Sequence, residues 1–420
     1  MRVRTLFVLA ILAREVFTFW TGHPFDFEIW VRTGYWVVRG VSPYSGMPLA
    51  PGVSFANDFG GPGLGPAIGY LPFWPLLLAG VYAFYALLGS PSPFVYYFLI
   101  KQPIIVCDIL LAYFLYRYLE RRGSDRASFA LKLWLFSPFN ILLSGIWGMF
   151  DAIPMLFVVL ALTAPPGSRR GVWAGVATFA KSIPLIFTVP LARGARPVRN
   201  LALALGIPVV ASLLIVWLAG WPTSAVGGTL QSTVARGGSS LSLWEIAYYL
   251  NLIGAIPDSS LGILAYAGYL WIAAVAVVTY VAYRWYGFNT ERGMVRSLLL
   301  ITLTFLLLRA EVNEQYSLYL YAIALFDIAM WSPQRRNLLL ASVAAVLAFN
   351  ATNDLLFIRY VAPIYPQALT VEANIISAID PLRNGLLFVE AMAFCALNIY
   401  YFFSLQRERH DRTEDPLFAP

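Results

Sequence analysis

Apolar segments of nearly bilayer-spanning length recur along the whole chain, and this feature limits the fold more than any other. A transmembrane helix needs about 20 predominantly apolar residues. Only 12% of the 420 residues are charged, about half the share that is usual in a soluble domain. We therefore predict an all-α, polytopic membrane protein. Ten segments are clear candidates for membrane spans: 4–21, 94–117, 129–147, 152–165, 200–220, 261–285, 295–311, 316–331, 337–357 and 384–405.

Two further apolar segments, 67–89 and 172–192, are each interrupted by two prolines. Proline removes a backbone hydrogen bond from a helix, and such segments are often interfacial or re-entrant. Cytoplasmic loops of membrane proteins are rich in Lys and Arg. The basic clusters of this chain all fall on one side only if neither segment crosses the membrane. We expect a bundle of about ten transmembrane helices (10–12), with both termini in the cytoplasm.

This orientation assigns five loops or turns to the outer face: 22–66, 148–151, 221–245, 311–315 and 359–383. Asp26, Asp151 and Glu314 then share one side of the membrane, although they are far apart in the sequence. The first outer loop is long and rich in Gly, Pro and aromatic residues, and we expect interfacial helices at its ends. A site built from these acids would lie on the extracytoplasmic face.

Composition argues against two classes of function. The net charge is +7, but the basic residues stand in short clusters between apolar segments, which suits membrane orientation better than nucleic-acid binding. Cys107 and Cys395 lie inside apolar segments, and no disulfide or metal framework follows from them. His23 and His410 are the only histidines, so a histidine-based metal site is not expected. We expect no bound metal and no cofactor.

Asp26 and Glu28 directly follow the first apolar segment, in the sequence Gly-His-Pro-Phe-Asp-Phe-Glu-Ile-Trp. Carboxylates near hydrocarbon are costly and persist mainly where they do chemistry, move an ion or pair with a cation. One interpretation is that Asp26 is a general base at the membrane boundary, with Glu28 helping to set its pKa. The alternative is that both acids stabilise the N-terminus of a loop helix, where the helix dipole favours negative charge. Asp26 can do both.

Asp151 and Lys181 are further polar positions in apolar surroundings. Asp151 opens a span and is a good N-cap, but a cap at the rim of a site is equally a binding position. A buried Lys181 would need a partner, and either a lipid phosphate or a carboxylate such as Asp108 would serve. Arg14 and Glu15 are expected to form an ion pair within the first span.

The turn Arg-Ala-Glu-Val-Asn-Glu-Gln-Tyr, which begins at Arg309, joins two spans with almost no loop. So many polar side chains in a tight turn exceed what solvation requires. The planar guanidinium of Arg309 suits a phosphate group. The simpler alternative is a local ion pair of Arg309 with Glu311 or Glu314.

Several catalytic motifs do not occur in the sequence. It has no Gly-rich nucleotide loop, no Walker sequence, no zinc-ligand spacing and no Gly-x-Ser-x-Gly elbow. It also has no Asp-x-Asp, the usual metal–nucleotide clamp of soluble sugar transferases. An activated sugar, if one is used, should therefore be carried by a lipid.

Six short motifs over about residues 20–320 resemble, in the same order, those of the GT-C glycosyltransferases. The first resembles the start of their first outer loop: Asp26-Phe-Glu-Ile-Trp followed by Gly40-Val-Ser-Pro-Tyr44. The others are Tyr70-Leu-Pro-Phe-Trp-Pro-Leu76, Asp108, the segment from Ser137-Pro138 to Phe150-Asp151, Lys181-Ser-Ile-Pro184 and Asn313-Glu-Gln-Tyr316. Two positions depart from the family pattern. Asn313 replaces a frequent His, and Met149 replaces a usual Gln.

The resemblance implies inverting transfer of a hexose, most often mannose or glucose, from a polyprenyl- or dolichyl-phosphate donor. The acceptor would be a lipid-linked glycan, a glycolipid or a protein. Asp26 would be the base, and Glu28 and Asp151 would orient the acceptor or the sugar. The donor site would be lined by Lys181, Arg309, Asn313, Glu314 and Tyr316. The single acid at Asp151 differs from the metal-dependent oligosaccharyltransferase branch, whose corresponding turn carries two acids.

No hydrophilic block is long enough for a separate soluble domain, so residues 1–420 are expected to form one integral membrane domain. Residues 1–330 would be the GT-C-like module, 331–405 additional transmembrane helices, and 406–420 a polar cytoplasmic tail. Two other functions stay open. A secondary transporter or lipid flippase would also use intramembrane charges and broken helices, although transporters usually show two matching halves. A non-catalytic assembly subunit would tolerate replacement of its acids.

Overall fold

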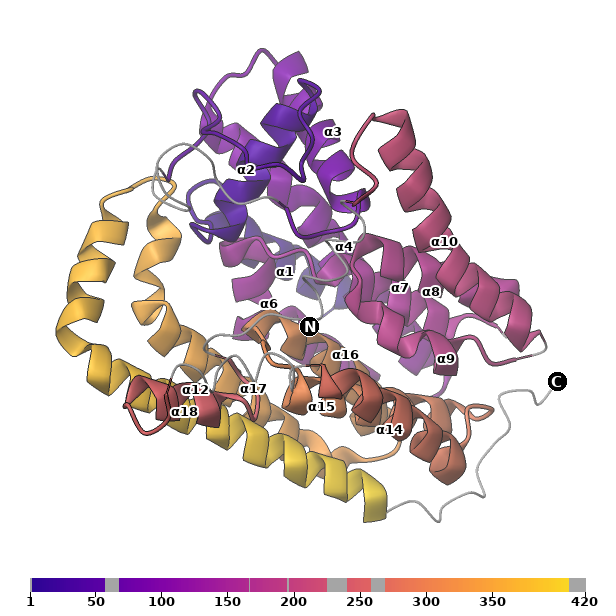
Figure 1. Cartoon of the computed structure of the whole chain (residues 1–420). Helices are drawn as coiled ribbons and strands as arrows, with labels where there is room; N and C mark the ends of the chain where they lie inside the picture. The colour runs from indigo at the N-terminus through magenta and orange to yellow at the C-terminus, as the bar shows by residue number, and fades with distance from the viewer. Residues whose placement is uncertain are drawn as a thin grey trace.

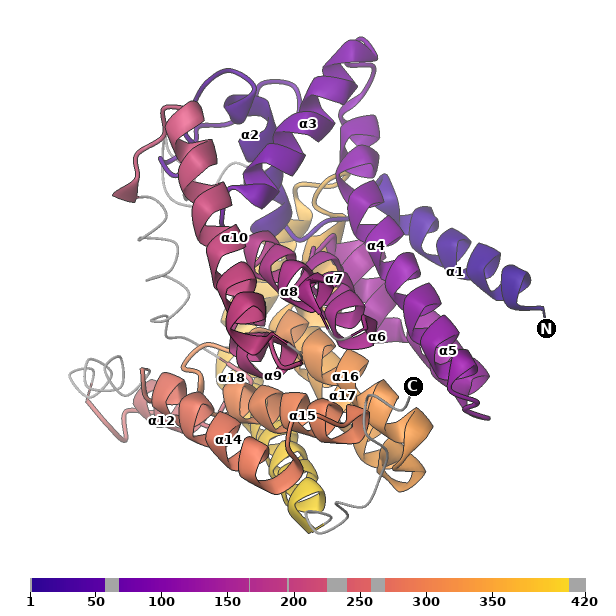
Figure 2. The same cartoon turned by 90° about the vertical axis from the view of Figure 1, so that its right-hand side faces the viewer.

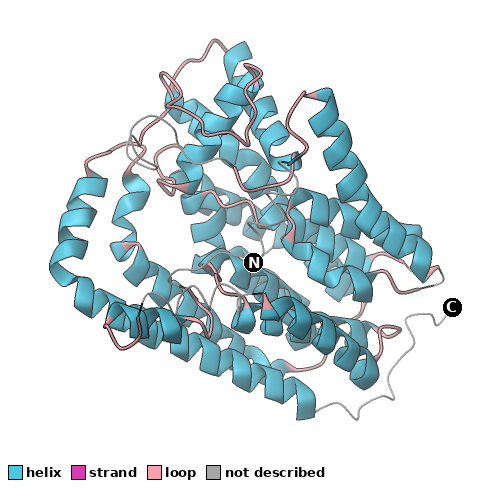
Figure 3. Cartoon of the chain, viewed as in Figure 1, coloured by secondary structure: helices cyan, strands magenta, loops and turns pink. Residues whose placement is uncertain are grey.

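The computed structural model describes residues 2–56, 68–165, 167–194, 196–224, 240–257 and 269–407. These residues form helices joined by loops and turns, and no β-strand occurs among them (Figures 1 and 3). The prediction of an all-α fold is thus confirmed for this part of the chain. The predicted tail lies outside the described residues from residue 408 onward.

A first group of helices is built around the long helix α4. Its members are α1 (Val3–Thr18), α4 (Pro93–Arg121), α5 (Ala127–Leu135), α6 (Pro138–Ile141) and α7 (Ala152–Thr163). Between α6 and α7 the chain forms a π-helical turn, Leu142–Trp147, which packs against α1. Gly145 permits this close approach, because a Cβ atom there would lie 3.1 Å from the Cα atom of Arg14. Such π-helical turns are frequent at functional sites.

A pair of helices covers one end of this group: α2 (Asp26–Val37) and α3 (Phe73–Leu87). The pair lies at the top of Figures 1 and 2. Aromatic rings join it to the bundle. Trp30 meets Trp74 edge-on with centroids 5.2 Å apart, and Trp74 stacks on Phe150 at 4.2 Å. Because large rings bury much apolar surface, these contacts hold the start of α2 against the turn that precedes α7.

The second proline-interrupted segment turns back on itself. It is part of α8 (Ser168–Ala180), a 3-10 turn (Ile183–Phe187) and α9 (Thr188–Leu191), which are followed by α10 (Pro197–Leu218). Gly171 of α8 packs against the backbone of Asn200. One turn further along α8, Gly175 packs against Ile207, so α8 and α10 run parallel. The chain between them therefore returns to the end at which α8 began, as expected for a re-entrant segment.

The C-terminal part of the chain forms a second group of helices, in the lower part and along the left side of Figure 1. It comprises α12 (Glu245–Leu252), α14 (Leu270–Tyr286), α15 (Glu291–Leu308), α16 (Ser317–Met330), α17 (Arg336–Asn353) and α18 (Ala368–Arg407). Short 3-10 turns lie at Glu314–Tyr316, Pro333–Arg335 and Leu355–Val361. Every residue of α16 except Met330 is buried. This helix contacts α15 and α17 as well as α4 and α7, and it joins the two groups.

Each of the ten predicted spans contains at least part of a helix, but fewer helices have the length and hydropathy of a complete membrane span. Among the described residues, α4, α10 and α18 qualify alone. Two bent pairs qualify jointly: α5 with α6 and the π-helical turn, and α17 with the neighbouring 3-10 turns. The structure therefore supports a membrane protein with three to five complete candidate spans in its described part.

The end of the chain differs from the prediction. The sequence predicts an outer loop over residues 359–383, whereas α18 begins at Ala368 and continues to Arg407. Residues 368–380 include three Ala and three Ile and contain no Gly or Pro, so they can continue a helix. Pro381 removes one helical hydrogen bond without ending the helix, and Figure 1 shows that α18 is bent.

Buried polar side chains tie the helices of the first group together. Arg14 of α1 donates a 2.6 Å hydrogen bond to the carboxylate of Asp108 in α4. Ser144 and Trp134 donate to the same carboxylate at 2.9 and 2.7 Å. The predicted pair of Arg14 with Glu15 is therefore wrong. Adjacent residues of a helix point in different directions, so a partner on another helix is better placed.

We expect Asp108→Asn to lower the unfolding temperature of the detergent-purified protein markedly. Removal of one partner leaves Arg14 buried without its counter-charge, which costs about 3 to 5 kcal/mol. A matched control is Glu120→Gln, which removes the exposed pair of Arg117 and Glu120. Exposed ion pairs contribute about 0 to 1 kcal/mol, so this variant should unfold near the wild-type temperature. Equal shifts in the two variants would contradict the role given to Asp108.

Candidate active site

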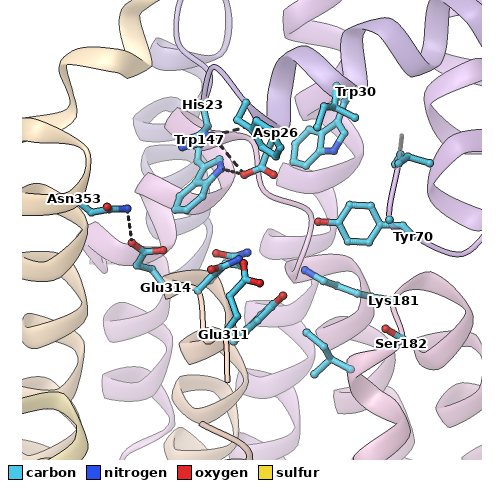
Figure 4. A pocket seen from close by; sticks show the side chains of 18 of the residues that line it. His23, Asp26, Trp30, Tyr70, Trp147, Lys181, Ser182, Glu311, Glu314 and Asn353 are labelled. Carbon is cyan, nitrogen blue, oxygen red and sulfur yellow. Dashed lines mark hydrogen bonds and ion pairs between the residues drawn. The ribbon is translucent and has the colours of Figure 1, made fainter. Parts of the chain in front are cut away.

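A cavity of about 410 Å³ lies where α2 meets both groups of helices. Segments far apart in the sequence line it, including the start of α2, the chain after α8, and the turn between α15 and α16 (Figure 4). Its charged and hydrogen-bonding residues include His23, Asp26, Tyr70, Trp147, Lys181, Ser182, Arg309, Glu311, Asn313, Glu314, Gln315, Tyr316, Asn353 and Arg359. So many polar groups inside an apolar bundle mark the cavity as the candidate active site.

Asp26 is the first residue of α2, and its side chain lines the cavity (Figure 4). Trp147 donates its indole N–H to the Oδ2 atom of Asp26 at 3.0 Å. The Nδ1 atom of His23 lies 3.4 Å from the same oxygen. The side chain of Asp26 is 20% exposed, so a substrate in the cavity can reach it. The helix N-terminus also favours its negative charge, and thus both interpretations of Asp26 fit this position.

A buried ammonium group holds the surroundings of Asp26 together. Lys101 of α4 donates to the carbonyl oxygens of Thr21 at 2.7 Å, Gly145 at 2.9 Å and Ile146 at 3.0 Å. Thr21 belongs to the segment that leads into α2, whereas Gly145 and Ile146 belong to the π-helical turn. A buried charge needs such compensation. Because the carbonyls come from two segments, Lys101 also sets the spacing between them.

The turn after the π-helix requires a glycine at Gly148. Its φ angle is +80°, in the left-handed region that side chains rarely adopt. A Cβ atom there would also lie 3.1 Å from both the Lys101 side chain and the ring of Phe27. This turn directs the following residues, Phe150 and Asp151, toward the chain after α8.

Lys181 and Asp151 form a buried ion pair, with Nζ and Oδ2 2.7 Å apart. Lys181 lines the cavity, and the fully buried Asp151 lies behind it. The carboxylate partner of Lys181 is therefore Asp151 and not Asp108. Three aromatic rings have their centroids 4.9, 5.2 and 5.5 Å from the ammonium nitrogen: those of Phe150, Tyr316 and Tyr70. The ion pair and the cation–π attraction hold this charge at the cavity wall.

The turn between α15 and α16 adds a second cation to the cavity. The guanidinium carbon of Arg309 lies 4.8 Å from the centroid of Tyr316, the same ring that faces Lys181. Asn313 and Glu314 of this turn also line the cavity. Two cations that share one cavity can bind a phosphate group, Arg through its planar fork and Lys as a point charge.

Glu314 is buried beside a second acid, Asp354. Asn353 donates to the Glu314 carboxylate at 3.4 Å, and the hydroxyl of Tyr360 donates to Asp354 at 2.6 Å. Arg359 lies 3.1 Å from Asp354. Burial, together with the negative charge of Asp354, raises the pKa of Glu314 to about 7. Glu314 therefore changes its charge near neutral pH.

Glu28 lies outside the cavity. Its carboxylate pairs with Arg32 at 2.6 Å and accepts the backbone N–H of Phe55 at 3.0 Å. Burial raises the pKa of Glu28, and the hydrogen bond from Arg32 opposes this effect. The carboxylate anchors the chain that follows α2 and does not face a substrate in the cavity. The predicted role of Glu28 in orienting the acceptor does not fit this position.

Six of the eight predicted site residues line the cavity: Asp26, Lys181, Arg309, Asn313, Glu314 and Tyr316. Sequence reasoning missed others that line it: His23, Trp147, Asn353 and Arg359. Trp147 stands in a motif that the resemblance already marked, and His23 lies three residues before Asp26. Asn353 and Arg359 come from a region that the resemblance does not reach. Within the described residues, no group of three or more His, Cys, Asp or Glu side chains is placed to hold a metal ion.

The chain matches the model of glycosyltransferase family 87 over residues 67–309. This region is more than half of the chain. It contains Asp151, Lys181 and Arg309, whereas Asp26 precedes it and Glu314 follows it. No curated protein matches the chain.

A double-mutant cycle tests the coupling of Lys181 and Asp151. Lys181→Met leaves a buried carboxylate and Asp151→Asn leaves a buried ammonium, and each loss should cost about 3 to 5 kcal/mol. The double variant removes both charges, so it should lose much less stability than the sum of the two single losses. Thermal unfolding of the purified variants measures all three changes. Additive losses would show that the two side chains do not depend on each other.

Proposed function

Because the chain belongs to glycosyltransferase family 87, we propose that it is an inverting, GT-C-type enzyme that takes a hexose from a polyprenyl- or dolichyl-phosphate donor. Mannose and glucose are the proposed sugars. The acceptor would be a lipid-linked glycan, a glycolipid or a protein. The family match supports glycosyl transfer, and the geometry of the cavity supports the roles assigned to its residues.

The position of Asp26 is the observation that carries this proposal. Its carboxylate lines the cavity, where Trp147 and His23 contact one of its oxygens. Lys181 and Arg309 line the same cavity. Direct displacement at a sugar needs one base for the acceptor and cations for the departing phosphate. The cavity contains both.

In the proposed reaction, Asp26 takes the proton of the acceptor hydroxyl while the hydroxyl oxygen attacks the anomeric carbon. The bond between that carbon and the phosphate oxygen breaks, and the lipid phosphate leaves with the bonding electrons. Lys181 and Arg309 stabilise the negative charge that develops on the phosphate. Attack and departure on opposite faces invert the anomeric configuration. A single displacement needs no covalent intermediate and no second nucleophilic carboxylate.

The remaining residues would support these steps. Asp151 would pair with Lys181 and hold its side chain at the cavity wall. Tyr316 would contact both the ammonium and the guanidinium with one ring. Asn313, where many family members have His, would offer its amide to the donor, and Glu314 would accept a sugar hydroxyl.

We also propose that the cavity opens on the extracytoplasmic face of a ten-span bundle, with the isoprenoid tail of the donor between helices. The length of α4 supports this orientation. The helix from Lys101, near the cavity, to Arg121 is about 30 Å long. This equals the thickness of the hydrocarbon core. Just beyond its end, Arg122 pairs with Glu291. These two residues belong to the clusters 117–132 and 284–296, whose basic residues predict a cytoplasmic position.

Asp26→Asn should lower sugar transfer by at least about 100-fold, because the amide has the size of the carboxylate but cannot accept the proton. The measurement is transfer of radiolabelled sugar from polyprenyl-phosphate donors in membranes. Glu120→Gln is the control, since this exposed acid lies far along α4 from the cavity.

Normal transfer by Asp26→Asn would reject its role as the base. Movement of a substrate across the membrane by the wild type, without sugar transfer, would favour the transporter or flippase instead. Transfer that survives replacement of every cavity acid would favour the non-catalytic subunit.

Cysteine labelling tests the orientation. In a background without Cys107 and Cys395, Arg39→Cys and Asp125→Cys place single thiols at exposed positions near opposite ends of the bundle. A membrane-impermeant maleimide added to intact cells should label the first variant only. After permeabilisation it should label both. The reverse pattern in intact cells would overturn the proposed extracytoplasmic site.

A further inference from the structure

His23 lies between two carboxylates that belong to different parts of the fold. Its Nδ1 atom is 3.4 Å from Oδ2 of Asp26, at the start of α2. Its Nε2 atom is 4.0 Å from Oδ1 of Asp354, at the end of α17. The two nitrogens of one imidazole thus face the proposed base on one side and a buried acid on the other.

Aromatic contacts fix the orientation of this imidazole. The ring of His23 stacks on Trp147 with centroids 4.8 Å apart and meets the edge of Tyr360 at 5.4 Å. Its side chain is only 11% exposed. Trp147 also donates to Asp26, and Tyr360 also donates to Asp354. The residues that hold the ring therefore hold both of its carboxylate neighbours.

The hydrogen bonds indicate which nitrogen carries the proton. The backbone N–H of Asp26 donates to Nδ1 of His23 at 3.3 Å, so Nδ1 is an acceptor and the proton lies on Nε2. Burial and the nearby Arg359 lower the pKa of His23 well below its ordinary value, which keeps the ring neutral. A neutral imidazole can accept a proton at one nitrogen while it releases another from the opposite nitrogen.

A second buried acid, Glu314, lies close to Asp354. The amide nitrogen of Asn353 lies 3.4 Å from a carboxylate oxygen of Glu314 and 3.5 Å from one of Asp354. Burial and the negative charge of Asp354 raise the pKa of Glu314 to about 7. Two buried carboxylates close together tend to share one proton, so the pair can store a proton near neutral pH.

We propose that His23 is a positioning residue that carries the acceptor proton from Asp26 to the pair of Asp354 and Glu314. This inference rests on the proposed transfer reaction. Asp26 takes the proton from the acceptor and passes it to Nδ1 of His23, while the proton on Nε2 moves to Asp354. The imidazole stays neutral and changes tautomer, and Asp26 becomes a carboxylate again. The contacts of 3.4 and 4.0 Å would shorten when substrates close the cavity.

The proposed proton relay predicts how the rate of sugar transfer depends on pH. When the pair already holds a proton, it cannot accept another, so transfer should rise with pH as Glu314 ionises near pH 7. Other charged or titratable groups around the pair are Arg359 and Tyr360 from the turn after α17, Glu372 and Arg383 from α18, and Arg309 and Glu311 from the turn before α16. Arg359 lies 3.1 Å from Asp354 and offers a positive charge to its carboxylate.

The test measures kcat, KM and their pH dependence for sugar transfer by the full-length protein. His23→Phe keeps a ring against Trp147 but has no nitrogen. Asp354→Asn keeps an acceptor for Tyr360 but cannot take a proton. Each should lower kcat at least about 10-fold with little change in the KM for the donor, and each should remove the rise near pH 7. Glu120→Gln is the control, because this exposed acid of α4 lies far from the relay, and it should keep the rise.

The outcomes separate this inference from the proposed function. If Asp26→Asn is inactive but His23→Phe and Asp354→Asn keep the wild-type rate and pH profile, the proposed relay is wrong. The assignment of Asp26 as the base is then kept. A lower kcat with an unchanged pH profile in both variants means that His23 and Asp354 are structural, which also overturns the relay. Normal transfer by Asp26→Asn rejects the base itself. If thermal unfolding shows that His23→Phe is not folded, the kinetics of Asp354→Asn alone test the relay.

Discussion

The ammonium group of Lys101 is the interaction on which the rest of the candidate site depends. It is fully buried and bonds to carbonyl oxygens of Thr21, Gly145 and Ile146. Inside a protein such bonds are stronger than in water, and an uncompensated charge would be costly. These bonds therefore fix the distance between the segment that leads to Asp26 and the segment that ends at Trp147. The contact of Trp147 with Asp26, and the stacking of His23 on Trp147, follow from it.

Charged residues of this protein serve two purposes: some form buried ion pairs between or beneath helices, and others line the cavity. Arg14 with Asp108 compensates charge between helices, and Glu28 with Arg32 does so beneath α2. Asp26 instead lines a cavity, where it can meet a substrate. An acid that follows an apolar segment is compatible with either purpose, which explains why Glu28 and Asp26 looked alike in the sequence. Their surroundings differ only because α2 turns one side chain inward and the other to the cavity.

Much of the fold was predictable, because hydropathy and helical length are local properties. The helices lie where the apolar segments are, and the segment around Pro184 turns back as its prolines indicate. The errors concern relations between distant residues or weak local signals. Arg14 finds Asp108 on another helix instead of its neighbour Glu15. Helix α18 passes through Pro381 because one lost hydrogen bond does not outweigh the helix-forming residues on both sides.

The sequence by itself determined the all-α class, the apolar character of the helices and six residues that line the cavity, since composition and short motifs carry this information. Only the tertiary structure decided which charges meet. Lys181 pairs with Asp151, His23 comes between Asp26 and Asp354, and Glu28 turns away from the cavity. Ion pairs and hydrogen bonds act over a few ångströms in space, and the partners are up to hundreds of residues apart along the chain. Their pairing follows from how the helices pack and not from local sequence.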